Sequence, residues 1–306
     1  MFKNESGQIR AGWLVLLAFT ALIIVQQLFA LPGAILLIFT EAPSLINGET
    51  GTPDIMAALD THPWIFLLVQ GGGSVGAILI TYLLWRFINK GTIKQLGFRG
   101  SVKDLWFGLF LGAISITVIF IVLLATGNVT LMNPLSSPQF SVYTISFLIL
   151  FILVGFSEEM FFRGYVMSTL ASRGNKKWVI YVASALIFSI AHGLNPNVSM
   201  LGLTNIAVVG VLFAYMFYAT NSLWLPIGYH ITWNYFQGNV FGFAVSGTAP
   251  NGIYSVETIA GRDWLTGGAF GLEGGLMATL LILVGFVATR GYCRWRGYEH
   301  EENTLN

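Results

Sequence analysis

The stretch SVYTISFLILFILVGFSEEMFFR, residues 141–163, decides the class of fold because it is long enough and apolar enough to cross a membrane. A transmembrane helix needs about 20 consecutive, mostly apolar residues. Seven further stretches of this kind lie at approximately 11–39, 64–86, 105–126, 178–193, 201–220, 223–245 and 270–290. The sequence therefore predicts an all-α, polytopic membrane bundle of about eight transmembrane helices.

The composition of the whole chain agrees with a membrane protein and excludes other classes. Of the 306 residues, 55% are hydrophobic and only 9% are charged, whereas a soluble domain is about 25% charged. The chain is also too hydrophobic to be disordered. Its net charge of +1 creates no field that would attract nucleic acid, so no nucleic-acid partner is expected. The single cysteine, Cys293, excludes an intrachain disulfide.

The basic residues indicate how the chain is threaded through the membrane. Of the 15 Lys and Arg residues, all but Arg262 lie before the first span, after the last, or around the connections on one side. Cytoplasmic connections of membrane proteins carry an excess of Lys and Arg. Both termini are therefore predicted to be cytoplasmic. No repeat or low-complexity linker divides the chain, so we expect a single multi-pass domain over residues 1–306 in the cell membrane.

Ionisable groups inside the predicted spans are costly and mark candidate functional residues. They are Glu158 and Glu159 in the fourth span, His192 in the fifth and His230 in the seventh. Asn234 follows His230 by one helical turn, so an imidazole and an amide would lie side by side on one helix face. Such a pair could donate hydrogen bonds to a developing oxyanion.

Helix geometry gives the two adjacent glutamates different surroundings. Adjacent helical residues point about 100° apart, so Glu158 and Glu159 are not expected to face one partner. Glu159 precedes Arg163 by four residues, which is the favourable order for an ion pair. Glu158 lacks such a partner, and desolvation would make it a better proton acceptor. Two other interpretations stay open: a helix end among the headgroups for the acids, and a buried core histidine for His192.

Three motifs lie on separate predicted spans in one order. EExxxR occurs at Glu158–Arg163, FxxxH at Phe188–His192, and a histidine motif with a downstream asparagine at Pro226–Asn234. Together, in a chain of this hydropathy, these motifs resemble those of the CAAX protease and bacteriocin-processing (CPBP) family. This family of intramembrane endopeptidases includes the type II CAAX prenyl endopeptidases. The matched catalytic core runs from about residue 141 to 245.

The resemblance implies a role for each matched residue. Glu158 would activate water, with His192 helping to hold or deprotonate it. His230 and Asn234 would stabilise the oxyanion of the tetrahedral intermediate, and the Glu159–Arg163 pair would be structural support. The implied substrate is a peptide or protein in the bilayer, lipidated or membrane-anchored in CAAX-type processing, or a leader peptide.

Metal dependence stays open on the sequence. The family is described both as metalloproteases and as glutamate-dependent enzymes without a catalytic metal. Glu158, His192 and His230 could in principle bind Zn²⁺. However, the sequence contains no HExxH motif. We expect that no cofactor is required and that water is activated without a metal ion, with a zinc-dependent protease as the alternative.

Two alternatives to a protease with a glutamate base are a transporter and a protease with a serine nucleophile. Buried Glu and His also build proton relays, so a non-enzymatic transporter is the main alternative. Gly72–Gly76 matches GxSxG, with Ser74 as a candidate nucleophile, but it lies in an apolar helix and also reads as a GxxxG packing motif. We favour packing. Glu273, near the start of the last predicted span, could line the active cavity, but we expect it at the outer headgroups.

Overall fold

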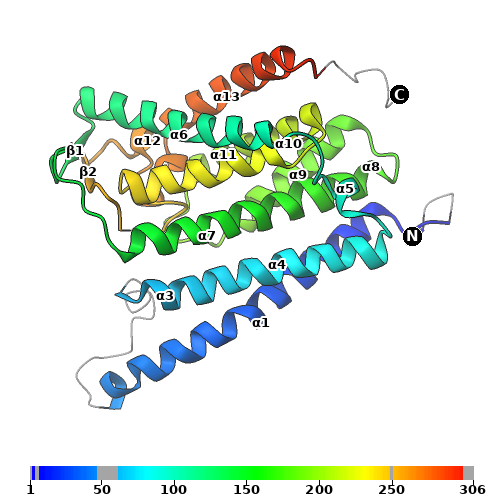
Figure 1. Cartoon of the computed structure of the whole chain (residues 1–306), viewed down its shortest axis with the longest axis horizontal. Coiled ribbons are helices and arrows are strands. Elements are labelled where there is room, and N and C mark those ends of the chain that lie inside the picture. The colour runs from blue at the N-terminus through cyan, green and yellow to red at the C-terminus, as the bar shows by residue number, and fades with distance from the viewer. Residues whose placement is uncertain (1, 4–6, 47–60, 249–250, 299–306) are drawn as a thin grey trace.

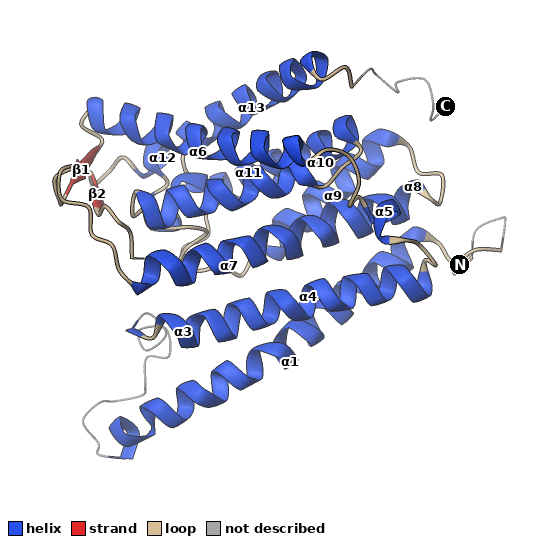
Figure 2. Cartoon of the chain, viewed as in Figure 1, coloured by secondary structure: helices blue, strands red, loops and turns tan. Residues whose placement is uncertain are grey.

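The computed structural model describes residues 2–3, 7–46, 61–248 and 251–298. Within these ranges the chain forms a bundle of long helices, with short helices and one small sheet in the connections (Figures 1 and 2). The first half contains α1 (Ala11–Ile46), α3 (Pro63–Phe66), η1 (Leu67–Gly71), α4 (Gly72–Leu83), η2 (Leu84–Ile88), α5 (Ile93–Leu96), α6 (Val102–Ala125) and β1 (Val129–Leu131). The central part contains α7 (Val142–Glu159), η3 (Met160–Met167), α8 (Ser168–Ala171), α9 (Lys177–Ala191) and α10 (Met200–Thr220). The last part contains α11 (Trp224–Tyr235), η4 (Phe236–Val240), β2 (Val256–Thr258), α12 (Asp263–Thr266), η5 (Gly268–Phe270), η6 (Leu272–Gly274) and α13 (Leu276–Trp295).

Six helices in the described part of the chain are long and apolar enough to cross a membrane. They are Ala11–Glu41, Pro63–Ile88, Val102–Ala125, Val142–Ala171, Met200–Thr220 and Leu276–Trp295. Each overlaps one predicted span. The other two predicted spans are also helical but shorter: α9 has 15 residues, and α11 has 12 and is continued by the five of η4. The helical membrane fold is thus confirmed, whereas eight crossings remain a prediction.

Two of the helix boundaries that differ from the predicted ones concern residues of the candidate site. Helix α9 ends at Ala191, and His192 is its C-cap with φ −91° and ψ 0°. The predicted span 178–193 was therefore too long, and His192 lies at the end of a helix rather than within one. Helix α13 begins at Leu276 instead of residue 270, because Gly271 has φ 102° and the N-cap Gly275 is extended, with φ −116° and ψ 158°, and neither conformation fits inside a helix.

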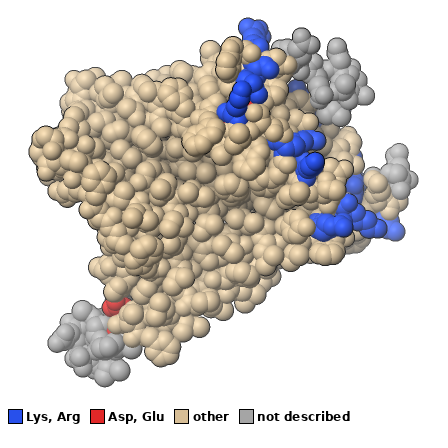
Figure 3. Space-filling view, in the orientation of Figure 1, with Lys and Arg blue, Asp and Glu red and all other residues tan. Residues whose placement is uncertain are grey.

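Lys and Arg side chains gather at one end of the bundle (Figure 3). Helix α1 begins and α13 ends at this same end (Figure 1). The clustering agrees with the predicted threading, and the cytoplasmic location of the termini stays a prediction. Arg163 is an exception, because its side chain is fully buried inside the bundle. It was counted among the basic residues that flank a connection, and that assignment was wrong.

Glycines bring α11 into close contact with α6 and α7. A Cβ atom on Gly108 would lie 2.3 Å from the carbonyl oxygen of Leu225, and one on Gly228 would lie 2.4 Å from that of Leu105. On the α7 side, a Cβ on Gly155 would lie 2.7 Å from the side chain of Ile231. Only glycine permits such close contact between helices. The backbone of α11, which carries His230 and Asn234, is therefore placed directly beside the end of α7.

The Gly72–Gly76 segment packs one helix against another. It lies inside α4, and a Cβ on Gly72 would be 2.6 Å from the backbone oxygen of Phe29 in α1. Ser74 donates its hydroxyl proton to the carbonyl of Gln70 in the same helical run, at 3.0 Å. The packing interpretation is confirmed, because the strand-turn-helix of a nucleophile elbow is not the structure of this segment.

One small sheet was not predicted. Strands β1 and β2 pair antiparallel, with Val129 opposite Thr258. The sheet lies at the end of the bundle away from the basic residues (Figures 1 and 3). It joins the connection after α6 to the long connection before α13.

Candidate active site

The residues of the three motifs meet around one cavity of about 570 Å³. Glu158 enters it from the end of α7, His192 from the C-cap of α9, and His230 and Asn234 from α11. The apolar part of the wall includes side chains of α1, α3, α7 and α10. Residues far apart in the sequence are thus brought to the wall of a single cavity.

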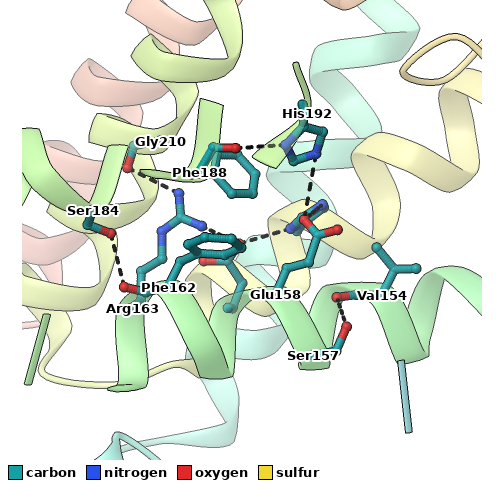
Figure 4. Close-up of polar contacts among 11 residues, drawn as sticks. Val154, Ser157, Glu158, Phe162, Arg163, Ser184, Phe188, His192 and Gly210 are labelled. Atoms are coloured by element: carbon teal, nitrogen blue, oxygen red, sulfur yellow. Dashed lines mark hydrogen bonds and ion pairs between the residues drawn. The ribbon is translucent and has the colours of Figure 1, made fainter. Parts of the chain in front are cut away.

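Glu158 faces both histidines without bonding directly to either. Its Oε2 atom lies 3.8 Å from Nε2 of His230 and 4.0 Å from Nε2 of His192. Both distances exceed those of hydrogen bonds. This oxygen is buried and makes no hydrogen bond within the described part of the chain, although the Glu158 side chain as a whole is 26% exposed. Figure 4 shows the Glu158 and His192 side chains directed toward each other.

Nδ1 of each histidine lies within hydrogen-bond distance of an acceptor oxygen, and this contact defines the tautomer. Nδ1 of His192 lies 2.8 Å from the carbonyl oxygen of Phe188, and Nδ1 of His230 lies 2.9 Å from Oε1 of Glu159. Because a carbonyl or carboxylate oxygen only accepts here, each Nδ1 carries the hydrogen and donates it. Each Nε2 is consequently directed toward Glu158, and in a neutral ring it is an acceptor.

Glu159 and Arg163 form the predicted ion pair. Nη1 of Arg163 lies 2.9 Å from Oε1 of Glu159, and both side chains are fully buried. Nη2 donates to the carbonyl of Gly210 at 3.2 Å, and the guanidinium carbon is 4.3 Å from the centroid of the Phe188 ring. A buried cation needs such compensation from a counter-charge, a carbonyl and an aromatic face. The pair thus links α7 and η3 to α9 and α10 (Figure 4).

The two glutamates do share a partner, which contradicts the expectation from helix geometry. Glu159 accepts from Nδ1 of His230, and Glu158 faces Nε2 of the same ring. The expectation failed because the two nitrogens lie on different edges of the imidazole, so one ring can meet two side chains that point apart. Glu159 therefore orients His230 as well as neutralising Arg163.

The wide helical turn after Glu159 is another feature that the sequence did not indicate. Residues 160–167 form the π-helix η3, and all eight are buried. Ser184 of α9 donates its hydroxyl to the carbonyl of Phe162 at 3.0 Å. Such turns are common at functional sites. This contact fixes α9, which carries His192, against the helix that carries Glu158.

Glu273 is a further acid on the cavity wall, and its expected place among the headgroups was wrong. The residue lies in η6 before α13, is only 8% exposed, and accepts hydrogen bonds from the Gln237 amide and, at 3.5 Å, the Ser246 hydroxyl. Burial raises the pKa of Glu273 to about 7. Gln237, which bonds Glu273, could have been identified from the sequence as a candidate site residue. It is a polar residue one turn after Asn234 in an apolar segment.

The polar residues do not form a recognisable zinc site. A zinc ion needs its nitrogen and oxygen ligands at about 2.0–2.2 Å. Among the described residues, no group of three or more His, Cys, Asp or Glu side chains is arranged to hold a metal ion. Glu158, His192 and His230 face one another, with Oε2 of Glu158 3.8–4.0 Å from the two Nε2 atoms, but they are not grouped closely enough to count as such a cluster.

Comparison with known families agrees with the motifs. Residues 138–236 match the model of the family described as type II CAAX prenyl endopeptidase Rce1-like. The chain carries an Rce1-like domain. This domain begins just before α7, ends at the start of η4, and contains Glu158, His192, His230 and Asn234. No curated protein and no solved structure matches the chain.

The Rce1-like domain confirms the resemblance to the CPBP family. Its family suggests an intramembrane endopeptidase, and therefore a peptide or protein substrate in a membrane setting. The six long apolar helices and the domain together indicate a multi-pass membrane protein.

Proposed function

We propose that this protein is a CPBP-type intramembrane endopeptidase in which Glu158 activates water for attack on a peptide carbonyl. The observation that most supports this proposal is the position of Oε2 of Glu158. This buried oxygen has no hydrogen-bond donor among the residues that the structure describes, and it faces Nε2 of both histidines in the wall of the cavity. A carboxylate oxygen without a donor is free to accept a proton, which a general base must do.

In this proposal the two histidines have different roles. His192 holds the attacking water through Nε2, since its Nδ1 hydrogen is donated to the Phe188 carbonyl. His230 acts as an imidazolium, whose Nε2 hydrogen is directed to the oxyanion together with the Asn234 amide. A charged His230 and Arg163 would balance the two glutamates, which leaves the buried cluster neutral.

The reaction then proceeds by transfer of one proton in each direction. Glu158 takes a proton from water while the water oxygen forms a bond to the carbonyl carbon. The carbonyl electron pair moves to oxygen, where His230 and Asn234 stabilise the negative charge. When the carbon–nitrogen bond breaks, Glu158 returns the proton to the leaving amine. The apolar cavity walls limit access of bulk water and so strengthen these interactions.

The proposed substrates are lipidated or membrane-anchored polypeptides processed in CAAX fashion, or leader peptides. The cavity wall supports an apolar substrate, because α1 contributes Phe19 and Leu22 and the start of the second span contributes Phe66. Cleavage of matched peptides with and without a C-terminal prenyl group would separate the two substrate types.

The central test replaces Glu158 by Gln, which keeps the shape and removes the base. Peptides whose termini change between membranes containing the wild type and Glu158→Gln identify a substrate, which is then cleaved by purified protein. General-base catalysis contributes about 10²–10⁴-fold, so we expect at least a hundredfold loss of rate. The control is Ser74→Ala, which removes the candidate serine nucleophile and should leave the rate unchanged. Undiminished cleavage by Glu158→Gln would overturn the assignment of the base.

The same variants separate a protease from a transporter. If the protein is a transporter, Glu158 and His230 form a proton relay, and their replacement reduces the flux of protons or solute. Such a protein would cleave no peptide. Reconstitution of the wild type with the identified peptide therefore decides between the classes. A proton or solute flux that depends on Glu158, without cleavage, would favour the transporter.

Metal-free activation of water is part of the proposal. We expect exhaustive chelation to leave the cleavage rate unchanged, and elemental analysis to find less than one zinc per chain. Activity that is lost on chelation and restored by Zn²⁺ would instead assign Glu158, His192 and His230 as metal ligands.

A further inference from the structure

A second cavity, of about 810 Å³, lies between α10 and α13 beside the start of α9. It shares no lining residue with the active-site cavity. Lys177 opens α9, Tyr215 and Tyr218 come from α10, and Phe286, Arg290 and Arg294 come from α13. No part of the proposed proteolytic mechanism uses this cavity.

The cavity concentrates positive charge that the described residues do not neutralise. Arg290 and Arg294 are four residues apart and lie on one face of α13, and Lys177 completes the basic set. Among the described residues, no Asp or Glu lines the cavity, and none of the three cations forms an ion pair. In contrast, the buried Arg163 forms an ion pair with Glu159. These three cations are therefore available to a negatively charged ligand.

The position of the cavity corresponds to the boundary between the apolar core of a membrane and water. Trp178 and Trp295, beside the basic residues in sequence, are 66% and 78% exposed. Exposed tryptophans are typical of the headgroup level. On α13 the wall continues from the arginines to Phe286 and Val287, and Val287 is 73% exposed. The cavity thus has a cationic rim and an apolar wall that continues toward the membrane core.

The walls of the cavity are held in place by their own contacts. Nζ of Lys177 lies 4.0 Å from the centroid of the Tyr218 ring, and Tyr215 stacks on Phe286 with centroids 5.9 Å apart. Tyr298, also on the wall, donates its hydroxyl to the buried carboxylate of Asp104 at 2.9 Å. A site whose walls are already ordered loses less entropy when a ligand binds.

We propose that this cavity binds the phosphate group of an anionic phospholipid, with Lys177, Arg290 and Arg294 around the phosphate and an acyl chain along Phe286 and Val287. Arginine and lysine are the residues that bind phosphate in proteins. Basic pockets between membrane helices bind lipid headgroups by the same chemistry. The location agrees with the end of the bundle where Lys and Arg gather (Figure 3).

Native mass spectrometry of the full chain in detergent, titrated with phosphatidylglycerol, phosphatidylcholine or inorganic phosphate, tests the proposal. The test variant is Lys177→Gln/Arg290→Gln/Arg294→Gln. Each basic side chain near a lipid surface contributes about fivefold in affinity, so we expect roughly a hundredfold weaker binding of phosphatidylglycerol. Wild-type protein should bind phosphatidylglycerol in preference to phosphatidylcholine. Inorganic phosphate should compete only weakly, because it lacks acyl chains.

A matched variant controls for general attraction between a basic surface and anionic lipid. Lys90→Gln/Lys94→Gln/Lys103→Gln removes three exposed cations outside the cavity and should bind phosphatidylglycerol like the wild type. Equal loss in both triple variants would overturn the proposal, as would unchanged binding in the first. Competition by phosphate as strong as that by the lipid would make this a phosphate site and overturn the lipid assignment. If the first variant does not fold, Arg294→Gln replaces it, with an expected loss of about fivefold.

Discussion

The α1–α4 pair and the α7–η3–α8 helix differ in what they bury. Only 22% of the most hydrophobic window of the first helix is buried inside the protein, compared with 56% in the α7–η3–α8 helix. In the first pair, Gly72 and Gly76 bring the backbones together. The second region buries Glu159 and Arg163 completely. Small residues suffice to join two helices, whereas ionised side chains are tolerated only where several helices enclose them.

The two regions contribute different kinds of residue to the active-site cavity. Helix α1 supplies wall residues such as Phe19 and Gln26, and its outer face is exposed. The helices α7, α9 and α11 supply the acid and the imidazoles. Changes in the enclosed region should therefore affect stability and chemistry together, and changes in the first pair should affect stability alone.

The largest effect on stability is expected from Arg163→Met. This change removes the guanidinium from the buried Glu159 carboxylate and leaves one negative charge in excess in the buried cluster. Breaking a buried ion pair costs about 3–5 kcal/mol of unfolding free energy. The double variant Glu159→Gln/Arg163→Met should be more stable than Arg163→Met, since no unpaired charge remains. Unfolding in mixed micelles measures both.

The control for this comparison is Arg86→Met at the exposed end of the bundle. A surface change of this kind should alter stability by about 0.5 kcal/mol or less. If Arg163→Met costs no more than Arg86→Met, the buried pair does not stabilise the enclosed region and the contrast drawn above is wrong.

The next largest effect is expected on the pH dependence of folding stability, and it comes from Glu273, whose hydrogen-bond partners are neutral. Burial raises its pKa from 4.5 to about 7, so the folded protein binds a proton that the unfolded chain releases. The protonated Glu273 carboxyl therefore stabilises the folded protein fully below pH 4.5, and this stabilisation is lost as the pH rises through 7. A shift of this size corresponds to about 3 kcal/mol. Glu273→Gln should remove this dependence.

Thermal midpoints of both proteins between pH 4 and 8 measure the Glu273 effect. The difference between wild type and Glu273→Gln isolates one carboxyl from the other titrating groups. Parallel curves across the whole range would show that Glu273 keeps its ordinary pKa.

Much of the site could be predicted from the sequence because the relevant rules are local. The Glu159–Arg163 pair follows from a spacing of four residues, and the motifs place Glu158 and His230 on separate apolar helices. The bond from His230 to Glu159 depends on how two distant helices meet, and no spacing in the sequence describes that contact. Glu273 was misplaced because it lies between Gly271, with φ 102°, and the extended Gly275, so that α13 begins later than hydropathy suggests.

The smallest effect is expected in the α1–α4 pair, from Gly72→Val. Its Cβ atom would lie 2.6 Å from the Phe29 backbone oxygen, so the two helices must separate. Overpacking of this kind costs about 1–3 kcal/mol. Val75→Ala on the same helix, at an exposed position, is the matched control and should change stability little. The rate of peptide cleavage per folded molecule should stay at the wild-type value in both variants. A Gly72→Val protein that folds with wild-type stability but cleaves slowly would show instead that the contact between α1 and α4 shapes the chemistry.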